Sequence, residues 1–82
     1  MPHPPLPYRP ANAREQLALS LRRMRAKREW SQEDLAAAAG LDRSFIAHVE
    51  RSARNISIDN IEKLAIGLGV TIAELFETQA PR

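Results

Sequence analysis

Residues 31–51 read SQEDLAAAAGLDRSFIAHVER and contain two short segments with the pattern of a helix. Ser31 is a preferred N-cap residue, and Asp34 completes a variant of the capping box. Gly40 is expected in the left-handed conformation just past the end of this helix, which stops it sharply. Asp42 is placed to cap the helix that follows. The sequence therefore predicts two short helices joined by a tight turn.

The second of these helices, expected from residue 43 to about 51, has two different faces. At about 100° per residue, Phe45, Ile46 and Val49 share an arc that suits a protein core. The other arc consists of Arg43, Ser44, Ala47, His48 and Arg51. It carries no acid, and its side chains are types that hydrogen-bond to base edges or touch a thymine methyl group. Two helices joined by a glycine-containing turn, the second exposing such a face, form a helix-turn-helix.

The rest of the chain fits an all-α fold of five short helices with no strand pattern. A helical pattern covers residues 13–28, and a fourth helix is expected after the N-cap Ser57, ending at Gly69. Its apolar positions repeat at helical spacing and are Ile58, Ile61, Leu64, Ala65 and Leu68. Thr71 and Glu74 form a further capping box that opens a short fifth helix. We expect one compact repressor-like domain over residues 13–78.

The two ends of the chain are predicted to be tails. Residues 1–12 contain five of the six prolines, which favour an extended and mobile segment. Residues 79–82 form a short C-terminal tail. The chain has 82 residues and no cysteine, and its apolar runs are too short to cross a bilayer. We therefore expect a single-domain, soluble, cytoplasmic protein with no membrane association.

The cations are distributed unevenly along the chain. Residues 22–54 carry eight cations against five acids, whereas residues 55–82 carry two cations against four acids. Ten of the twelve cations are Arg, whose forked guanidinium suits phosphate and guanine. The alternative is a solvated charged face. The sequence contains neither metal-ligand spacing nor a nucleophile with a base, so we expect no enzyme, no metal and no cofactor.

The sequence LRRMRAKREWSQEDLAAAAGLDRSFIAHVERSARNISIDNIEKLAIGLGVTIAELF resembles the XRE-type helix-turn-helix domains of Cro and phage-repressor proteins. The resemblance covers roughly residues 17–77. SQEDLA opens the second helix, AGLD makes the turn, IAHVER ends the third helix and LGVTIAELF closes the domain. Within this family, LDRSFIAHVERSARNIS is most similar to the controller proteins of restriction–modification systems.

The exposed arc supplies the candidate base contacts. They are Arg43, Ser44, Ala47 and His48, with Arg43 at the helix start, where base contacts concentrate. His48 lies on the same arc, and its partner could be a base, a phosphate or only water. The candidate phosphate contacts are Gln32, Arg51, Arg54, Asn55 and Ser57. Gln32 is included because of the family resemblance, which implies that its side-chain amide contacts a phosphate and braces a side chain of the recognition helix. Ser57 has the alternative role of a plain N-cap.

Arg25 and Glu50 are assigned to structure rather than to DNA. The resemblance implies that the Arg of the first helix pairs with the acid at the end of the recognition helix. Such a pair would set the angle between the two helices. Arg22, Arg23 and Lys27 remain generic phosphate candidates.

The fifth helix is the candidate dimer interface. It has more large apolar side chains than so short an element can bury alone, namely Val70, Ile72, Leu75 and Phe76. The alternative is that they complete the core of one chain, and we expect both roles. The predicted function is a homodimeric, sequence-specific transcription regulator that binds double-stranded DNA at a pseudo-palindromic operator and blocks or recruits RNA polymerase. A restriction–modification controller is the preferred assignment; a phage-type repressor and an antitoxin or adaptor module are the alternatives.

Overall fold

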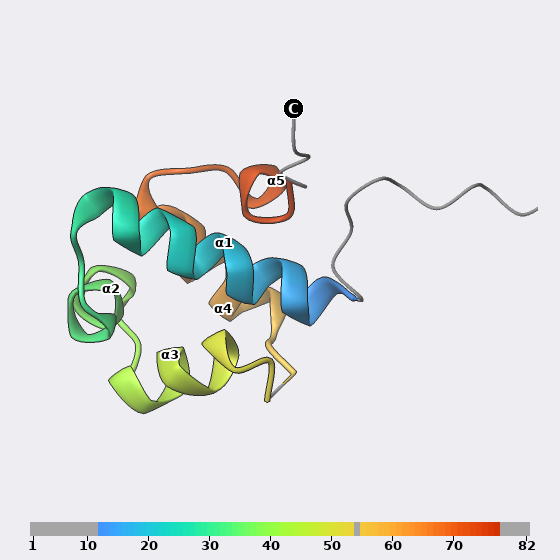
Figure 1. Cartoon of the computed structure of the whole chain (residues 1–82), viewed down its shortest axis with the longest axis horizontal. Coiled ribbons are helices and arrows are strands. Elements are labelled where there is room, and N and C mark those ends of the chain that lie inside the picture. The colour runs from blue at the N-terminus through green and yellow to red at the C-terminus, as the bar shows by residue number, and fades with distance from the viewer. Residues whose placement is uncertain (1–11, 54, 78–82) are drawn as a thin grey trace, which may run out of the picture.

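The computed structural model describes residues 12–53 and 55–77, and the described chain folds as five helices without a strand. Figure 1 shows α1 running across the middle of the bundle, with α3 on one side and α5 on the other. The helices are α1 Ala13–Arg28, α2 Gln32–Ala39, α3 Arg43–Glu50, α4 Ile58–Leu68 and α5 Ile72–Leu75. The predicted all-α, five-helix fold is confirmed. The expectations for residues 1–11 and 79–82 lie outside the described residues.

Side-chain caps fix where four of the helices begin. The amide of Asp34 donates to the Ser31 hydroxyl at 3.0 Å, and the amide of Ser31 donates to the Asp34 carboxylate at 2.9 Å. Thr71 and Glu74 form the same reciprocal box at α5, and these hydrogen bonds lower the pKa of the Glu74 carboxyl. Asn12 and Ser57 cap α1 and α4. The capping signals in the sequence therefore predicted the starts of α2, α4 and α5 correctly, whereas the cap by Asn12 was not predicted.

Asp42 is a partial exception. It occupies the N-cap position of α3, but its side chain makes no capping hydrogen bond. Its backbone carbonyl instead accepts from the amides of Phe45 and Ile46. The predicted start of α3 is right, whereas the predicted side-chain cap is wrong, because the exposed carboxylate makes no hydrogen bond to the first amides.

Left-handed residues end three of the helices and continue the chain after a fourth. Gly40 and Gly69 have φ values of 69° and 70° at the ends of α2 and α4, as the sequence predicts. Glu29 ends α1 at φ 55°, and Ser52 follows α3 at φ 58°. These two residues carry a Cβ atom in a conformation that L-residues rarely adopt, so both turns contain local strain.

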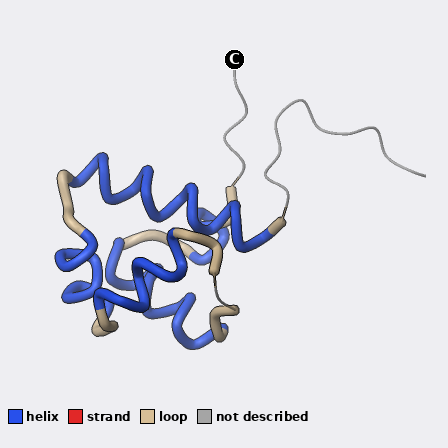
Figure 2. The backbone as a smooth tube through the Cα atoms, turned by 60° about the horizontal axis from the view of Figure 1, so that its bottom comes forward, coloured by secondary structure: helices blue, strands red, loops and turns tan. Residues whose placement is uncertain are grey.

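The core forms where α1, α2, α3 and α4 meet, and α5 closes it against α1 and α4. Figure 2 shows the helices packed around this centre with only short loops between them. Its fully buried large side chains are Leu17, Leu21, Leu35, Ile46, Leu64 and Leu75. The apolar positions of α4 are buried as predicted except at its start: Ile61 is half-buried, and Ile58 is 69% exposed. Ile58 is the first residue of α4 and is not part of the core cluster.

A close approach between two backbones sets the distance from α4 to α2. A Cβ atom added to Gly67 would lie 2.9 Å from the backbone of Ala38 and Ala39. Glycine is therefore required here for space, although its own φ is ordinary for a helix. The end of α4 is also tied to α1, because the Arg28 guanidinium donates to the carbonyl of Leu68 at 2.7 Å.

Candidate nucleic-acid interface

The outer face of α3 presents the polar arc that the sequence predicts. Arg43, Ser44 and Arg51 are exposed, and Ala47 and His48 are half-buried. The opposite side of α3 is anchored, since Ile46 is 0% exposed and Val49 is 3% exposed. The five side chains of the arc therefore share one surface of a firmly held helix. Figure 1 shows this helix on the outside of the bundle.

A partly buried ion pair holds the last turn of α3 against α1. Nε and a terminal nitrogen of Arg25 donate to the two carboxylate oxygens of Glu50, at 2.7 and 2.8 Å. The Arg25 side chain is 19% exposed and that of Glu50 is 4% exposed. The hydrogen bonds to Glu50 raise the pKa of Arg25, so the guanidinium stays charged. Arg25 also donates to the carbonyl of Trp30, which fixes the start of the turn before α2.

Two further side chains converge on Glu50. The side-chain amide of Gln32 donates to its carboxylate at 3.1 Å, and the guanidinium of Arg22 donates to its backbone carbonyl. Glu50 is thus contacted from α1 and from α2. Gln32 braces a side chain of α3, and Arg22, although exposed, supports the end of α3. The role of Arg22 was missed because its partner is a main-chain oxygen, which no sequence pattern reveals.

Arg43, at the start of the exposed arc, has an acidic neighbour on α2. Its Nε lies 3.4 Å from a carboxylate oxygen of Glu33, and the two side chains are 59% and 70% exposed. This ion pair crosses the turn of the two-helix unit. It was not expected from the sequence, because Glu33 reads there as an ordinary first-turn acid of α2.

The loop after α3 carries the remaining candidate phosphate contacts. Asn55 is exposed, and its side-chain oxygen accepts from the guanidinium of Arg14 on α1. The hydroxyl of Ser57 accepts from the amide of Asn60 at 3.2 Å, so it serves as the N-cap of α4. Arg54 lies outside the described residues. Residues 55–57 of the loop are therefore attached to α1 through Asn55 and to α4 through Ser57.

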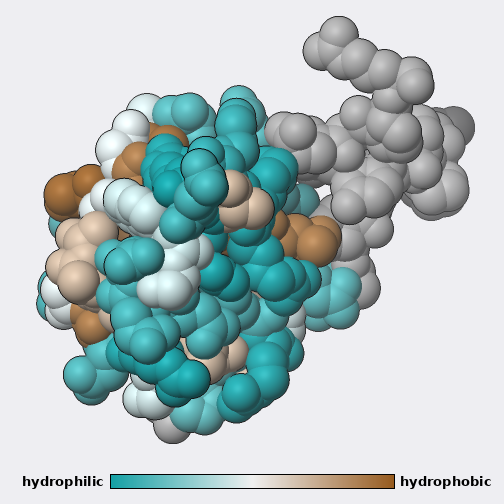
Figure 3. Space-filling view, turned by 60° about the vertical axis from the view of Figure 1, so that its left-hand side comes forward, coloured by the Kyte–Doolittle hydropathy of each residue, from teal (hydrophilic) through white to brown (hydrophobic). Residues whose placement is uncertain are grey.

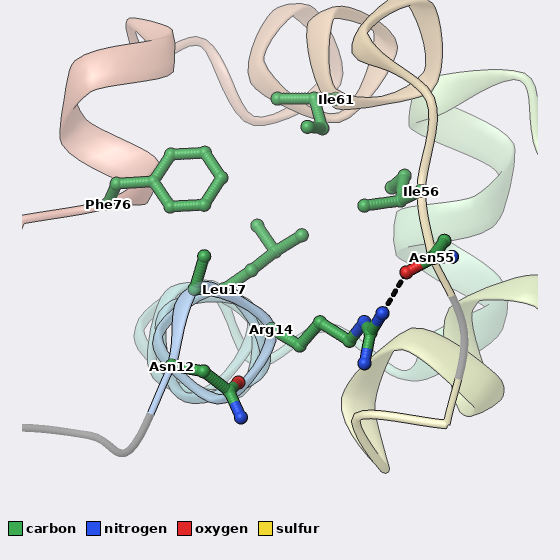
Figure 4. A pocket seen from close by; sticks show the side chains of 8 residues that line it. Asn12, Arg14, Leu17, Asn55, Ile56, Ile61 and Phe76 are labelled. Carbon is green, nitrogen blue, oxygen red and sulfur yellow. Dashed lines mark hydrogen bonds between the residues drawn. The ribbon is translucent and has the colours of Figure 1, made fainter.

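A cavity of about 540 Å³ lies beside this loop. Figure 4 shows Leu17, Ile56, Ile61 and Phe76 gathered on its apolar side. Arg14 and Asn55 meet at its polar edge, where the dashed line marks their hydrogen bond. The cavity separates the Arg14–Asn55 bridge from α5.

Charged and polar side chains dominate the surface near α2. Figure 3 looks onto this side of the bundle, and the hydrophobic groups there form small separate patches. Within residues 12–53 and 55–77, no helix is long and apolar enough to span a membrane.

The two-helix unit formed by α2 and α3 lies inside a region that matches a known family. The helix-turn-helix model HTH_3 matches residues 21–75. The chain belongs to the XRE-type helix-turn-helix family. This family consists of DNA-binding regulators, and the prediction that the chain is not an enzyme is confirmed. The predicted resemblance to controller proteins is confirmed as well.

Named relatives of this helix-turn-helix chain include regulators from several bacteria. A hypothetical transcription factor of Neisseria meningitidis is 48% identical over 59 residues, which are 72% of this chain and 56% of that protein. The control protein C.MunI of a Mycoplasma species is 46% identical over 50 residues, or 61% of this chain and 68% of that protein. The crystal structure of the restriction–modification controller C.AhdI from Aeromonas hydrophila superposes with a TM-score of 0.73 and 44% identity, covering 77% of this chain and 96% of that one.

The helix-turn-helix domain ends in α5, where the candidate dimer residues have different environments. Leu75 is 0% exposed, so it completes the core of its own chain and offers no surface to a partner. The expectation that Leu75 also contributes to a dimer interface is therefore wrong. Val70 and Phe76 are half-buried against the core, whereas Ile72 is 36% exposed. Only these three retain surface for a second chain.

Proposed function

We propose that this chain is a dimeric, sequence-specific transcription regulator of the restriction–modification controller type. The observation that carries the proposal is the acid-free arc on α3, held in place by the partly buried Arg25–Glu50 pair. The similarity to C.MunI and C.AhdI, which are named as control and controller proteins, supports the controller assignment. A regulator of this kind works in the cytoplasm, where it blocks or recruits RNA polymerase at a promoter.

The base contacts are assigned to the arc of α3. The guanidinium of Arg43 is suited to fork onto O6 and N7 of a guanine, and the Ser44 hydroxyl can donate or accept at a base edge. His48 lies on the same arc one turn further along the helix, and Ala47 permits close approach or contact with a thymine methyl group. Together they cover the few base pairs that one recognition helix reaches.

The phosphate contacts are assigned to the flanks of α3. Gln32 uses one amide N–H on Glu50, and the second N–H remains available for a phosphate oxygen. Ser57 accepts a hydrogen bond as a cap, which leaves its own O–H to donate to DNA. Arg51 and Asn55 are exposed on the helix end and loop. The assignment of Arg54 rests on the sequence.

Two copies are required for useful selectivity. One forked contact gives about 1–3 kcal/mol of discrimination, which is too little to find one site in a genome. A dimer through Val70, Ile72 and Phe76 would set two α3 helices about 34 Å apart, one helical turn of DNA. Figure 1 shows α5 and α3 on opposite sides of α1, so the same chain can engage a partner and DNA at once.

Selection of binding sites from random duplex DNA by the full chain tests the proposal. We expect enrichment of a pseudo-palindrome whose half-sites lie about one helical turn apart. The Lys63→Ala variant, which removes an exposed cation from α4, should enrich the same sequence. A genomic match upstream of a restriction methyltransferase or endonuclease gene would support the controller assignment. No enrichment at moderate salt would refute DNA recognition, and a match beside a small toxin gene would refute the controller assignment.

A further inference from the structure

Glu33 places a negative charge beside the residue assigned to read a base. It lies in the first turn of α2, and its carboxylate is 3.4 Å from Nε of Arg43 at the first position of α3. A carboxylate next to a DNA-binding surface opposes the approach of phosphates. The helix dipole favours an acid in the first turn of α2, but at this position the same charge also lies beside Arg43.

The geometry of the pair allows it to be exchanged for another contact. Both side chains are more than half exposed, and a pair of this kind is held by at most about 1 kcal/mol. The contact to Glu33 is made through Nε of Arg43. A guanine fork can use the terminal nitrogens, so the carboxylate and a base are not forced to compete for the same N–H groups.

The effect of the pair depends on the DNA that Arg43 meets. On random DNA, Arg43 has no guanine in register with the other side chains of the arc and is attracted chiefly by phosphates. The neighbouring carboxylate partly cancels the charge on which this attraction depends. On a cognate site, Arg43 forms directional hydrogen bonds to the neutral O6 and N7 acceptors of guanine, which a neighbouring carboxylate weakens less than it weakens attraction to a charged phosphate. The carboxylate therefore weakens non-specific binding more than specific binding.

We propose that Glu33 is a specificity-determining residue that raises the ratio of cognate to random DNA affinity by acting on Arg43. This inference rests on the proposed function, because it needs a cognate site that Arg43 reads. Glu33 lies on α2, outside the recognition helix, and would act on recognition without contacting a base itself.

A double-mutant cycle on the full chain tests this role. Dissociation constants are measured for Glu33→Gln, Arg43→Ala and the double variant, on the selected operator and on a scrambled duplex. Glu33→Gln should tighten binding to scrambled DNA about two- to fivefold, the size expected for an exposed pair, and tighten operator binding by less. In the Arg43→Ala background, Glu33→Gln should leave the operator-to-scrambled ratio unchanged.

Glu62→Gln is the matched control, since it removes the same charge from an exposed position of α4 and should not change the ratio. Equal tightening on both duplexes, or a changed ratio that persists without Arg43, would overturn the role of Glu33 while leaving the proposed function intact. If the wild-type chain itself shows no preference for any operator, the proposed function fails and this inference fails with it.

Discussion

Arg25 donates two hydrogen bonds to the two carboxylate oxygens of Glu50, and this pair joins α1 to the last turn of α3. Both carboxylate oxygens of the buried Glu50 side chain therefore accept a hydrogen bond from a charged group. The pair is part of the scaffold of the DNA-binding face, because neither residue belongs to the exposed arc of α3.

Loss of the Arg25 side chain should destabilise the fold. Arg25→Ala leaves the 4%-exposed Glu50 carboxylate without its charged partner. We expect a cost of about 3 kcal/mol, at the lower end of the range for a broken buried pair. Urea unfolding followed by circular dichroism measures the change. Arg25→Lys keeps the charge but loses the forked contact, so its free energy of unfolding should lie between those of the wild type and Arg25→Ala. An Arg25→Ala protein of full stability that no longer binds DNA would instead assign Arg25 to the DNA contact.

Arg43 and Arg54 should have different binding signatures. Arg43→Ala should cost about 1–3 kcal/mol per half-site on the operator and relax selection at one symmetric pair of positions. Arg54→Ala should weaken operator and random DNA alike and lower the slope of log affinity against log salt by about one unit per half-site. Salt titrations of both variants on both duplexes measure this. Equal losses on the two duplexes for Arg43→Ala would contradict base reading.

The dimer should depend on the exposed surface of α5. Ile72→Glu places a charge at a position that is 36% exposed, so it should weaken association without unfolding the chain. Sedimentation at micromolar concentration should give twice the chain mass for the wild type and a shift to monomer for the variant. Ile58→Glu changes a 69%-exposed position on α4 and serves as the control. A monomeric wild type that still binds a palindrome tightly would contradict this interface.

Gly67→Ala should destabilise the protein although alanine favours helices. The added Cβ would sit 2.9 Å from backbone atoms of α2, which cannot rotate away. Overpacking of this kind costs about 1–3 kcal/mol, which exceeds the gain of about 1 kcal/mol in helix propensity. Thermal unfolding checks the prediction. Ile66→Ala, at the exposed neighbouring position, should change the melting temperature little, and a stabilised Gly67→Ala would show that α2 and α4 can separate at no cost.

The capping box of α5 should respond to acid. Hydrogen bonds from Thr71 lower the pKa of Glu74 below its ordinary value of 4.5. A lowered folded-state pKa stabilises the fold above pH 4.5 and loses this contribution as the pH falls through the folded-state value. Thr71→Val removes the hydroxyl donor, so the pKa of Glu74 should move back toward 4.5 in an NMR titration. An unchanged titration curve would show that the backbone amide alone lowers the pKa.

The parts of this fold that the sequence predicted are those encoded locally. Ser31 with Asp34, and Thr71 with Glu74, mark helix starts through partners three residues away, and Gly40 marks an end through its own backbone conformation. The space required at Gly67 was not predictable, because it depends on how closely a distant helix approaches.

The candidate site shows the same division. The arc of α3 follows from helix periodicity, so its members were predicted from the order of residues alone. The contact between Glu33 and Arg43 depends on the angle of the turn between two helices. The contact between Arg22 and the Glu50 carbonyl depends on the packing of α1 against α3. Neither the angle between α2 and α3 nor the packing distance between α1 and α3 can be predicted from a local sequence pattern.

The convergence of Arg22, Arg25 and Gln32 on Glu50 separates the residues that orient α3 from those that face outward on it. Substitutions at Ser44, Ala47 and His48 leave all of these orienting contacts intact. Operator preference can therefore change, in evolution or by design, through a few substitutions on the exposed arc while the orientation of α3 stays the same. Related regulators that share one cell could in this way acquire separate operators without any change in their folding.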